Sequence, residues 1–168
     1  MNSFTLENIK QSVYYQWRMH HIKTYMAIWG VIAVFSLLVT FFVTVGVDSR
    51  LRVIAFVDWS VVVVIWGLFL GVFALYDYSK ARSFVRRYKN FKQHEAVLCN
   101  PGTSYWYRGA IYYNVIIEDG NTSVVARTNA CFSGILFSKF KLEDYNNKRV
   151  LGLLDPDTER FYIVKTVD

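Results

Sequence analysis

Two long apolar stretches with few or no charges dominate the pattern of apolar and polar positions along this chain. Residues 24–47 contain no charged side chain, and residues 57–77 carry acidic side chains only near the two ends of the stretch. A helix over residues 24–47 would be roughly 36 Å long, which exceeds the ~30 Å hydrocarbon core of a bilayer. The β-branched run 61–65 is expected to be helical too, because a lone strand leaves its backbone unpaired in lipid. The pattern predicts two transmembrane helices, 24–47 and 57–77, joined by a short external loop at 48–56.

An amphipathic pattern precedes the first span. Leu6, Ile9, Val13 and Trp17 recur at spacings of three and four, which places them on one face of a helix. The pattern predicts an N-terminal helix over residues 1–23. Two placements stay open: a helix lying in the headgroup region of the inner leaflet, or a helix packed on the soluble domain or on a partner chain.

A basic segment follows the second span. Residues 78–93 continue a helical pattern in which apolar side chains occupy one face and cationic side chains the others. Cationic residues beside a membrane attract anionic lipid, at about 1 kcal/mol each near the surface. The predicted lipid-binding residues are Lys80, Arg82, Arg86, Arg87 and Lys89.

The charge distribution predicts the orientation. The chain of 168 residues has a net charge of +6, all of it in the two stretches that border the predicted spans. Because Lys and Arg concentrate on the cytoplasmic side, both termini are expected in the cytoplasm, with the protein in the inner (cytoplasmic) membrane of a bacterial cell. The two cysteines, Cys99 and Cys131, would then be free thiols in a reducing compartment. The first apolar run begins too late, and is too long, for a cleaved signal peptide.

Small and hydroxyl-bearing residues interrupt the apolar spans. The second span contains a GxxxG motif, which lets another helix approach closely, and the first carries hydroxyls at i, i+4 and i+8. These faces either pack the hairpin against itself, mediate oligomerisation, or line a polar path. The candidates for helix packing and oligomerisation are Gly30, Ser36, Thr40, Thr44, Gly67 and Gly71.

Residues 94–168 change to short β-like runs broken by turns. Turn signals stand at 100–103, 119–121 and 155–159, and each separates apolar runs. About five strands in so short a segment are typical of a small barrel. The fold class predicted is membrane α + β: a two-helix transmembrane hairpin with a small C-terminal antiparallel β-barrel-like domain. Residues 129–147 stay unassigned between strand, loop and short helix.

Three short segments of this domain carry a resemblance. Ala96-Val97 at the start of an apolar strand, the run Tyr112–Val115, and an apolar strand ending at Asp155-Pro156 resemble the small β domain of the NfeD-like membrane proteins and of a related domain family of unknown function. Those proteins pair transmembrane helices with an SH3- or OB-like barrel. The resemblance covers roughly the last 75 residues, departs in the insert 132–147, and implies an architecture more than an activity.

The sequence offers little enzyme chemistry. It contains no P-loop, no GxSxG, no HExxH and no Cys/His zinc spacing, so we expect a protein that is not an enzyme and binds no cofactor or metal. Exposed aromatic and cationic side chains on a strand are typical of a recognition surface. The predicted partner surface is Trp106, Arg108 and Tyr112. Nucleic acid is not an expected partner, because the excess positive charge lies beside the membrane.

Two functional hypotheses follow. The first is a non-catalytic inner-membrane protein whose cytoplasmic β domain binds a partner protein or ligand, while the hairpin anchors and oligomerises. The second is an oligomeric, membrane-disrupting or pore-forming effector of a bacterial defence system, gated by the β domain. The GxxxG motif and the hydroxyl stripe motivate the second hypothesis.

Overall fold

The chain folds into two compact units. The computed structural model describes residues 4–46, 48–99, 101–103, 110–119, 122–129, 131–132 and 142–167. The first unit, which we call the hairpin unit, is the continuous segment His21–Ser79. The second, the sheet unit, combines Met1–His20 with Lys80–Asp168, so residues from both sides of the hairpin in sequence fold together.

The N-terminal segment forms two helices where the sequence pattern predicts one over 1–23. Helix α1 spans Leu6–Gln11 and α2 spans Val13–Thr44. Ser12 separates them because its backbone is extended, with ψ at 147°. The Ser12 hydroxyl donates to the Ile9 carbonyl at 2.7 Å and accepts from the Tyr15 amide at 3.4 Å, so it closes α1 and caps α2.

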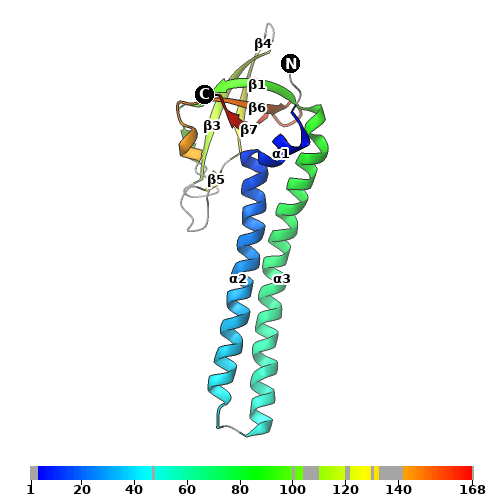
Figure 1. Ribbon diagram of the computed structural model, residues 1–168, viewed down its shortest axis with the longest axis vertical. Helices are drawn as coiled ribbons and strands as arrows, with labels where there is room; N and C mark the ends of the chain where they lie inside the picture. Colours follow the sequence, from blue (N-terminus) through cyan, green and yellow to red (C-terminus); the bar gives the residue numbers. More distant parts are fainter. Residues whose placement is uncertain are drawn as a thin grey trace. The chain divides into compact units, whose positions relative to one another are not determined.

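The loop expected at 48–56 is helical from its second residue. Helix α3 spans Ser49–Arg87 and lies alongside α2 over the hairpin unit (Figure 1). Gly46 adopts a φ of +83°, which ends the turn after α2, and the Asp48 carbonyl accepts the Arg52 amide at 3.1 Å to begin α3. No proline or glycine follows in the expected loop, so the chain returns directly into helix.

The basic helix predicted over 78–93 ends earlier than expected. Helix α3 stops at Arg87, and a single 3-10 turn, η1 (Tyr88–Asn90), follows it. Phe91 is extended, and strand β1 begins at Lys92.

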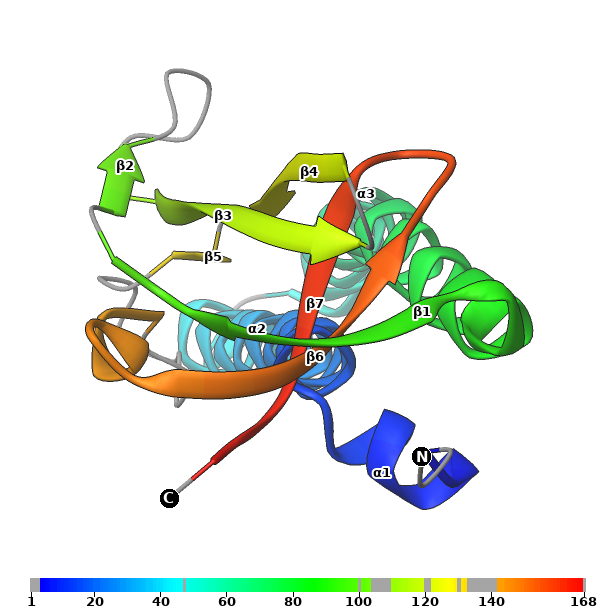
Figure 2. The same ribbon diagram turned by 90° about the horizontal axis from the view of Figure 1, so that it is seen from above.

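The rest of the sheet unit is one curved sheet of seven strands (Figure 2). The predicted hairpin turns at 119–121 and 155–159 are each flanked by antiparallel pairs, β3 with β4 and β6 with β7; Gly120 and Asn121 lie outside the described residues. A 3-10 turn, η2 (Leu142–Tyr145), precedes β6. The strands are β1 (Lys92–Val97), β2 (Pro101–Thr103), β3 (Ala110–Asp119), β4 (Thr122–Thr128), β5 (Cys131–Phe132), β6 (Arg149–Asp155) and β7 (Arg160–Thr166).

The prediction of an antiparallel barrel is wrong in two respects. The hydrogen-bonded order is β1-β6-β7-β4-β3-β2, with β5 also on β3, and β4 pairs with β7 in parallel, so the sheet is mixed. Over the described residues the sheet is also not closed, because its end strands β1 and β2 do not pair with each other. Closure requires a continuous ladder at a fixed stagger around the ring, and β2 offers only three residues for it.

The core of the sheet unit lies on the inner face of this curved sheet. Alternate residues of β3, namely Tyr113, Val115 and Ile117, are buried there, together with Phe161 of β7. Each side chain of this size that is fully buried stabilises the fold by roughly 1.5–3 kcal/mol. The period of two in β3 therefore decides which of its residues form the core.

A second apolar cluster joins the helices to the outer face of β6 and β7. Ile9 and Tyr14 from the N-terminal helices pack with Phe84 of α3 against Leu153 and Val164. Of the two placements left open for the N-terminal segment, the structure has the one packed on the sheet. Of the amphipathic face predicted at the N-terminus, Ile9, Val13 and Trp17 are therefore buried by protein, whereas Leu6 is exposed.

Aromatic rings hold this cluster together. Tyr14 meets Phe84 and Tyr162 edge to face, at centroid distances of 5.1 and 5.0 Å. Phe91 stacks on Tyr162 at 5.5 Å with an angle of 8° between the planes. Such pairs contribute about 0.5–1.5 kcal/mol each beyond the area that they bury.

Candidate functional site

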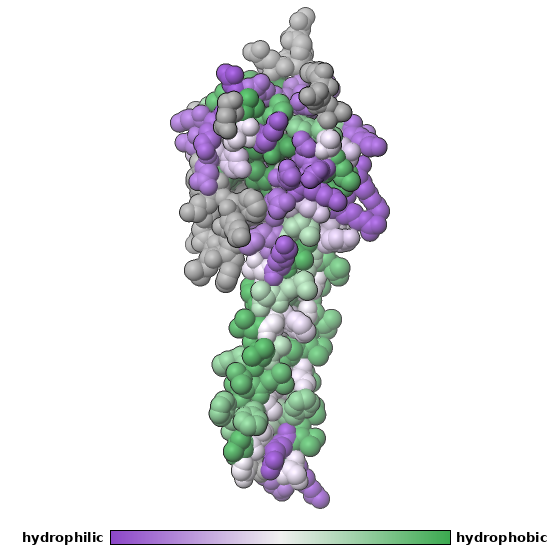
Figure 3. Space-filling model, viewed as in Figure 1, coloured by the Kyte–Doolittle hydropathy of each residue, from purple (hydrophilic) through white to green (hydrophobic). Residues whose placement is uncertain are grey.

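The hairpin unit presents apolar side chains over most of its surface. Helices α2 and α3 are both long and apolar enough to cross a membrane, and most of their large apolar side chains are exposed (Figure 3). A core helix of a soluble protein would bury these side chains instead.

One glycine of the GxxxG motif is used inside the hairpin. The Trp29 indole Nε1 donates to the Val63 carbonyl oxygen at 3.2 Å. A Cβ placed on Gly67 would lie 2.7 Å from that same nitrogen, so a larger residue would displace the indole from this position. Gly67 therefore serves the contact between α2 and α3, as in the simplest of the three uses considered for these residues.

The other predicted packing residues divide into open and enclosed positions. A Cβ on Gly30 or Gly71 would have no heavy atom of the described residues within 4 Å, outside its own helical turn. Ser36 and Thr40 are buried. The Thr40 hydroxyl donates to the Ser36 carbonyl at 2.8 Å, and the Thr44 hydroxyl donates to the Thr40 carbonyl at 2.6 Å. The two threonine hydroxyls are therefore satisfied on their own helix, as is usual for threonine in apolar helices.

A buried polar contact crosses the hairpin between the start of one span and the end of the other. His21 Nδ1 lies 3.5 Å from Asp77 Oδ2, and the Asp77 side chain is almost fully buried. One turn further along α2, the Tyr25 and Phe73 rings lie 6.2 Å apart, centroid to centroid. The sequence analysis did not name this pair. The signal was available, because an antiparallel hairpin brings the start of one span level with the end of the other.

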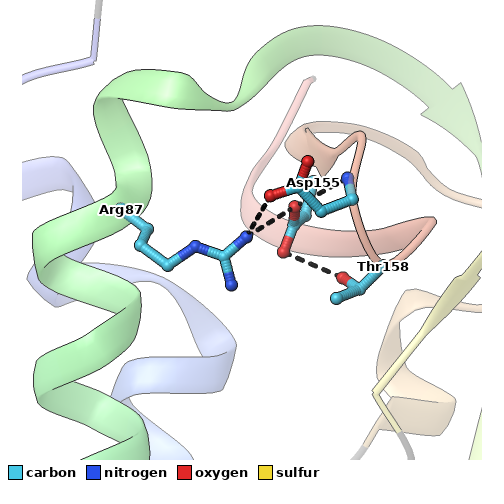
Figure 4. A network of polar contacts seen from close by, with 4 residues as sticks. Arg87, Asp155 and Thr158 are labelled. Atoms are coloured by element: carbon cyan, nitrogen blue, oxygen red, sulfur yellow. Dashed lines mark hydrogen bonds and ion pairs between the residues drawn. The ribbon is translucent and has the colours of Figure 1, made fainter.

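Arg87, one of the predicted lipid-binding residues, is committed to the sheet unit. Its guanidinium Nη2 lies 3.2 Å from Asp155 Oδ1 and 2.7 Å from Asp157 Oδ2, as Figure 4 shows. Asp155 is 1% exposed and also accepts from the Asp157 amide at 3.1 Å and the Thr158 hydroxyl at 2.8 Å. This network, which we call the Arg87 clamp, ties the end of α3 to the β6–β7 turn.

The remaining predicted lipid-binding residues face solvent. Lys80, Arg82, Arg86 and Lys89 are all exposed on the last turns of α3 and on η1. Their exposure leaves the lipid prediction standing for these four positions.

The outer face of β3 and β4 forms a bare surface. Ile116 and Val125 are paired across the two strands and are 71% and 61% exposed. Next to them, Asn114 is paired with Arg127. The Arg127 guanidinium lies over the Tyr112 ring at 4.3 Å, and its Nε donates to Asn114 Oδ1 at 3.3 Å. We call these five residues the β3–β4 patch.

Of the predicted partner surface, only Tyr112 can be placed. It is half-buried and belongs to the β3–β4 patch through its contact with Arg127. Trp106 and Arg108 lie outside the described residues. The sequence analysis missed Arg127, Ile116 and Val125, although the alternation of β3 and β4 would have put them on one face.

Tyr162 of β7 has a strongly displaced pKa. Burial, with smaller contributions from Tyr14 and Asp155, raises the pKa of the Tyr162 phenol from 10.0 to about 12. The phenol therefore stays protonated over the physiological range, as expected for a side chain that packs in the aromatic cluster.

Within the described part of the chain, no group of three or more His, Cys, Asp or Glu side chains is placed to hold a metal ion. No protein-family model, no curated protein and no solved structure matches the chain.

Proposed function

We propose that this protein is a two-span membrane anchor for a binding domain, in which α2 and α3 cross the bilayer and the sheet unit docks a partner protein. The observation that carries the proposal is the exposure of large apolar side chains around the hairpin unit. In water this surface would cost roughly 25 cal/mol for every Å² left exposed, whereas lipid tails cover it.

The sheet unit is built from the segments before and after the hairpin, which supports a hairpin with both ends on the same side of the membrane. Ile9 from before the hairpin packs with Leu153 and Val164 from after it, so the two flanking segments share one folded unit. An even number of crossings returns the chain to the side on which it started. The cationic residues that flank the spans then favour the cytoplasmic face of a bacterial inner membrane.

The partner-binding part of the proposal rests on the β3–β4 patch. Its exposed apolar pair, Ile116 and Val125, lies beside an aromatic ring and a guanidinium, and Tyr and Arg are enriched where protein partners bind most tightly. The exposed cationic residues Lys80, Arg82 and Arg86 of α3 and Lys89 of η1 would contact anionic lipid headgroups.

The experiment has two arms. Membranes containing the full chain are first extracted with alkaline carbonate, and the protein is expected in the pellet; release into the supernatant would contradict the anchor. A photo-crosslinking residue is then placed at Val125 or, as a control, at Leu68 of the hairpin. The account expects the Val125 position to give a discrete protein adduct that Leu68 does not give, and absence of any such adduct counts against partner docking.

A second function, an oligomeric membrane effector, is favoured by one observation. Gly71 and Gly30 both have open space over their backbones, so another helix could approach there. Reconstituted protein that releases a trapped dye in proportion to oligomer formation would support the effector. Vesicles that stay sealed while the protein oligomerises would remove it.

A further inference from the structure

Half of the outer face of the sheet is covered by protein and half is bare. Over β6 and β7, helices α1, α2 and α3 bury Leu153 and Val164. Over β3 and β4 the same alternation brings Ile116 and Val125 to the surface, where they are 71% and 61% exposed and belong to neither buried cluster of the described residues. Two β-branched side chains paired across strands are typical of a sheet face that packs against something.

Two arginines lie side by side on the bare half, and no described carboxylate is paired with either. Arg127 of β4 is in register with Arg160 of the parallel strand β7, so both side chains leave the sheet on the same face. Among the described side chains, no carboxylate forms an ion pair with either arginine. Asp155 is the residue opposite Arg160 on β6, and its carboxylate is held by the Arg87 clamp.

Arg127 is also held in place in advance of any ligand. Its guanidinium lies over the Tyr112 ring and its Nε donates to Asn114 Oδ1, while the side chain is exposed and its two terminal nitrogens have no hydrogen-bond partner among the described residues. A guanidinium fixed in this way loses little side-chain entropy when it binds, and its fork of donors matches the two oxygens of a carboxylate.

From this geometry we propose that the β3–β4 patch, together with Arg160, docks an acidic segment of a partner protein, in which a Glu or Asp stands between apolar residues. The carboxylate pairs with Arg127 while the flanking apolar side chains cover Ile116 and Val125. The apolar pair selects a peptide over an inorganic anion, which would leave that pair exposed. This proposal rests on partner docking, and it adds the chemistry and the place of the contact.

The test uses the full chain in detergent micelles and an array of immobilised nine-residue peptides. Each peptide has one central Glu between Leu, Ile, Val or Phe residues, and each has a twin with Gln in place of the Glu. Some Glu peptides are expected to bind at least about tenfold more tightly than their twins, because a charge-assisted, bidentate hydrogen bond is lost in the twin. An array in which no Glu peptide exceeds its twin overturns the proposal.

Three variants locate the binding. Arg127→Gln is expected to abolish the preference for Glu peptides, whereas Arg149→Gln, which removes an exposed arginine paired with Glu95 at the far side of the sheet, is expected to leave it unchanged. Ile116→Thr is expected to weaken the binding of Glu and Gln peptides to the same extent. The proposal would be refuted by a Glu preference that survives Arg127→Gln. It would also be refuted if inorganic phosphate at about 10 mM, a concentration that competes for a weak anion site, removed the preference as effectively as free Glu peptide does.

Failure here and failure of the proposed function give different results. If the Val125 crosslink forms and Arg127→Gln leaves it intact, partner docking stands and the acidic segment is wrong. If neither crosslink nor peptide preference is found, partner docking itself fails, while the carbonate extraction still reports on the anchor.

Discussion

Replacing Arg87 by methionine would leave the Asp155 carboxylate buried without its cationic partner. Methionine keeps most of the aliphatic length of arginine and favours helix, so the change isolates the charge. In the native fold Arg87 Nη2 lies 3.2 Å from Asp155 Oδ1, and the Asp155 side chain is 1% exposed. The variant therefore tests whether the Arg87 clamp stabilises the sheet unit.

The expected loss is about 2 kcal/mol. At 3.2 Å the gross attraction between two unit charges is about 5 kcal/mol for an effective dielectric constant of ~20. Removing one partner of a fully buried pair costs roughly 3–5 kcal/mol. Here the cost is lower, because the Arg87 side chain is 40% exposed and because Asp155 keeps its bonds to the Asp157 amide and the Thr158 hydroxyl.

Thermal unfolding of the full chain in detergent, followed by near-UV circular dichroism, reports on the packed tyrosines of the sheet unit. A loss of about 2 kcal/mol should lower the midpoint by roughly 10 °C. Asp157→Ala is the matched control: its side chain is 76% exposed, so the loss of its bond to Arg87 should cost no more than about 1 kcal/mol.

A double-mutant cycle separates charge from packing. Asp155→Asn removes the negative charge, so Arg87→Met should cost at least about 1 kcal/mol less in that background than in the native chain. Additive effects of the two changes, or an Arg87→Met midpoint equal to that of Asp157→Ala, would refute the role given to the clamp.

Three further outcomes follow from other contacts. In a chain with Trp29 as its one tryptophan, Gly67→Leu should push the indole out of the hairpin and raise the quenching of its fluorescence by brominated lipid. Gly71→Leu should leave this quenching unchanged. Equal quenching in both variants would argue against the contact. Gly152→Ala should destabilise the sheet unit by roughly 2 kcal/mol in thermal unfolding, since its Cβ would lie 2.5 Å from the Phe161 ring and 2.6 Å from a backbone oxygen; an unchanged midpoint would contradict this. Because the pKa of Tyr162 is higher in the folded state than in the unfolded state, the protonated phenol contributes fully to stability below pH 10.0, and this contribution is lost as the pH rises toward about 12. The unfolding midpoint of Tyr162→Phe should therefore fall less steeply over that range than the midpoint of the native chain. Parallel curves would count against the raised pKa.

Local patterns in the sequence predict the elements of this fold better than their assembly. The uncharged runs predict α2 and α3, because length and the absence of charge suffice to specify a long apolar helix. The sequence analysis misses the break at Ser12, since a lone serine within an amphipathic pattern also fits the polar face of one helix. The packing of Ile9 on Leu153 is a contact between distant parts of the chain, and helical periodicity carries no information about the partner.

The candidate site shows the same limit. Strand β3 carries apolar residues at successive positions 115, 116 and 117, a pattern that fits burial on both faces. In the structure Val115 and Ile117 are buried on the inner face of the sheet. Ile116 is exposed on the outer face, because the helices pack over β6 and β7 instead. Which half of an outer face is covered depends on the strand order, and the crossover that places β7 beside β4 leaves no local signal.

In the proposed topology, the segments before and after the hairpin lie on one side of a membrane, and the link between its helices lies on the other. The most direct measurement is labelling of single cysteines by a membrane-impermeant maleimide in sealed vesicles of each orientation. In a background with Cys99 and Cys131 replaced by serine, the exposed residues Glu7, Asp48 and Lys165 are changed to cysteine one at a time. The account predicts that positions 7 and 165 react from the same side of the membrane and position 48 only from the opposite side. Labelling of all three from one side, or of positions 7 and 165 from opposite sides, would contradict it.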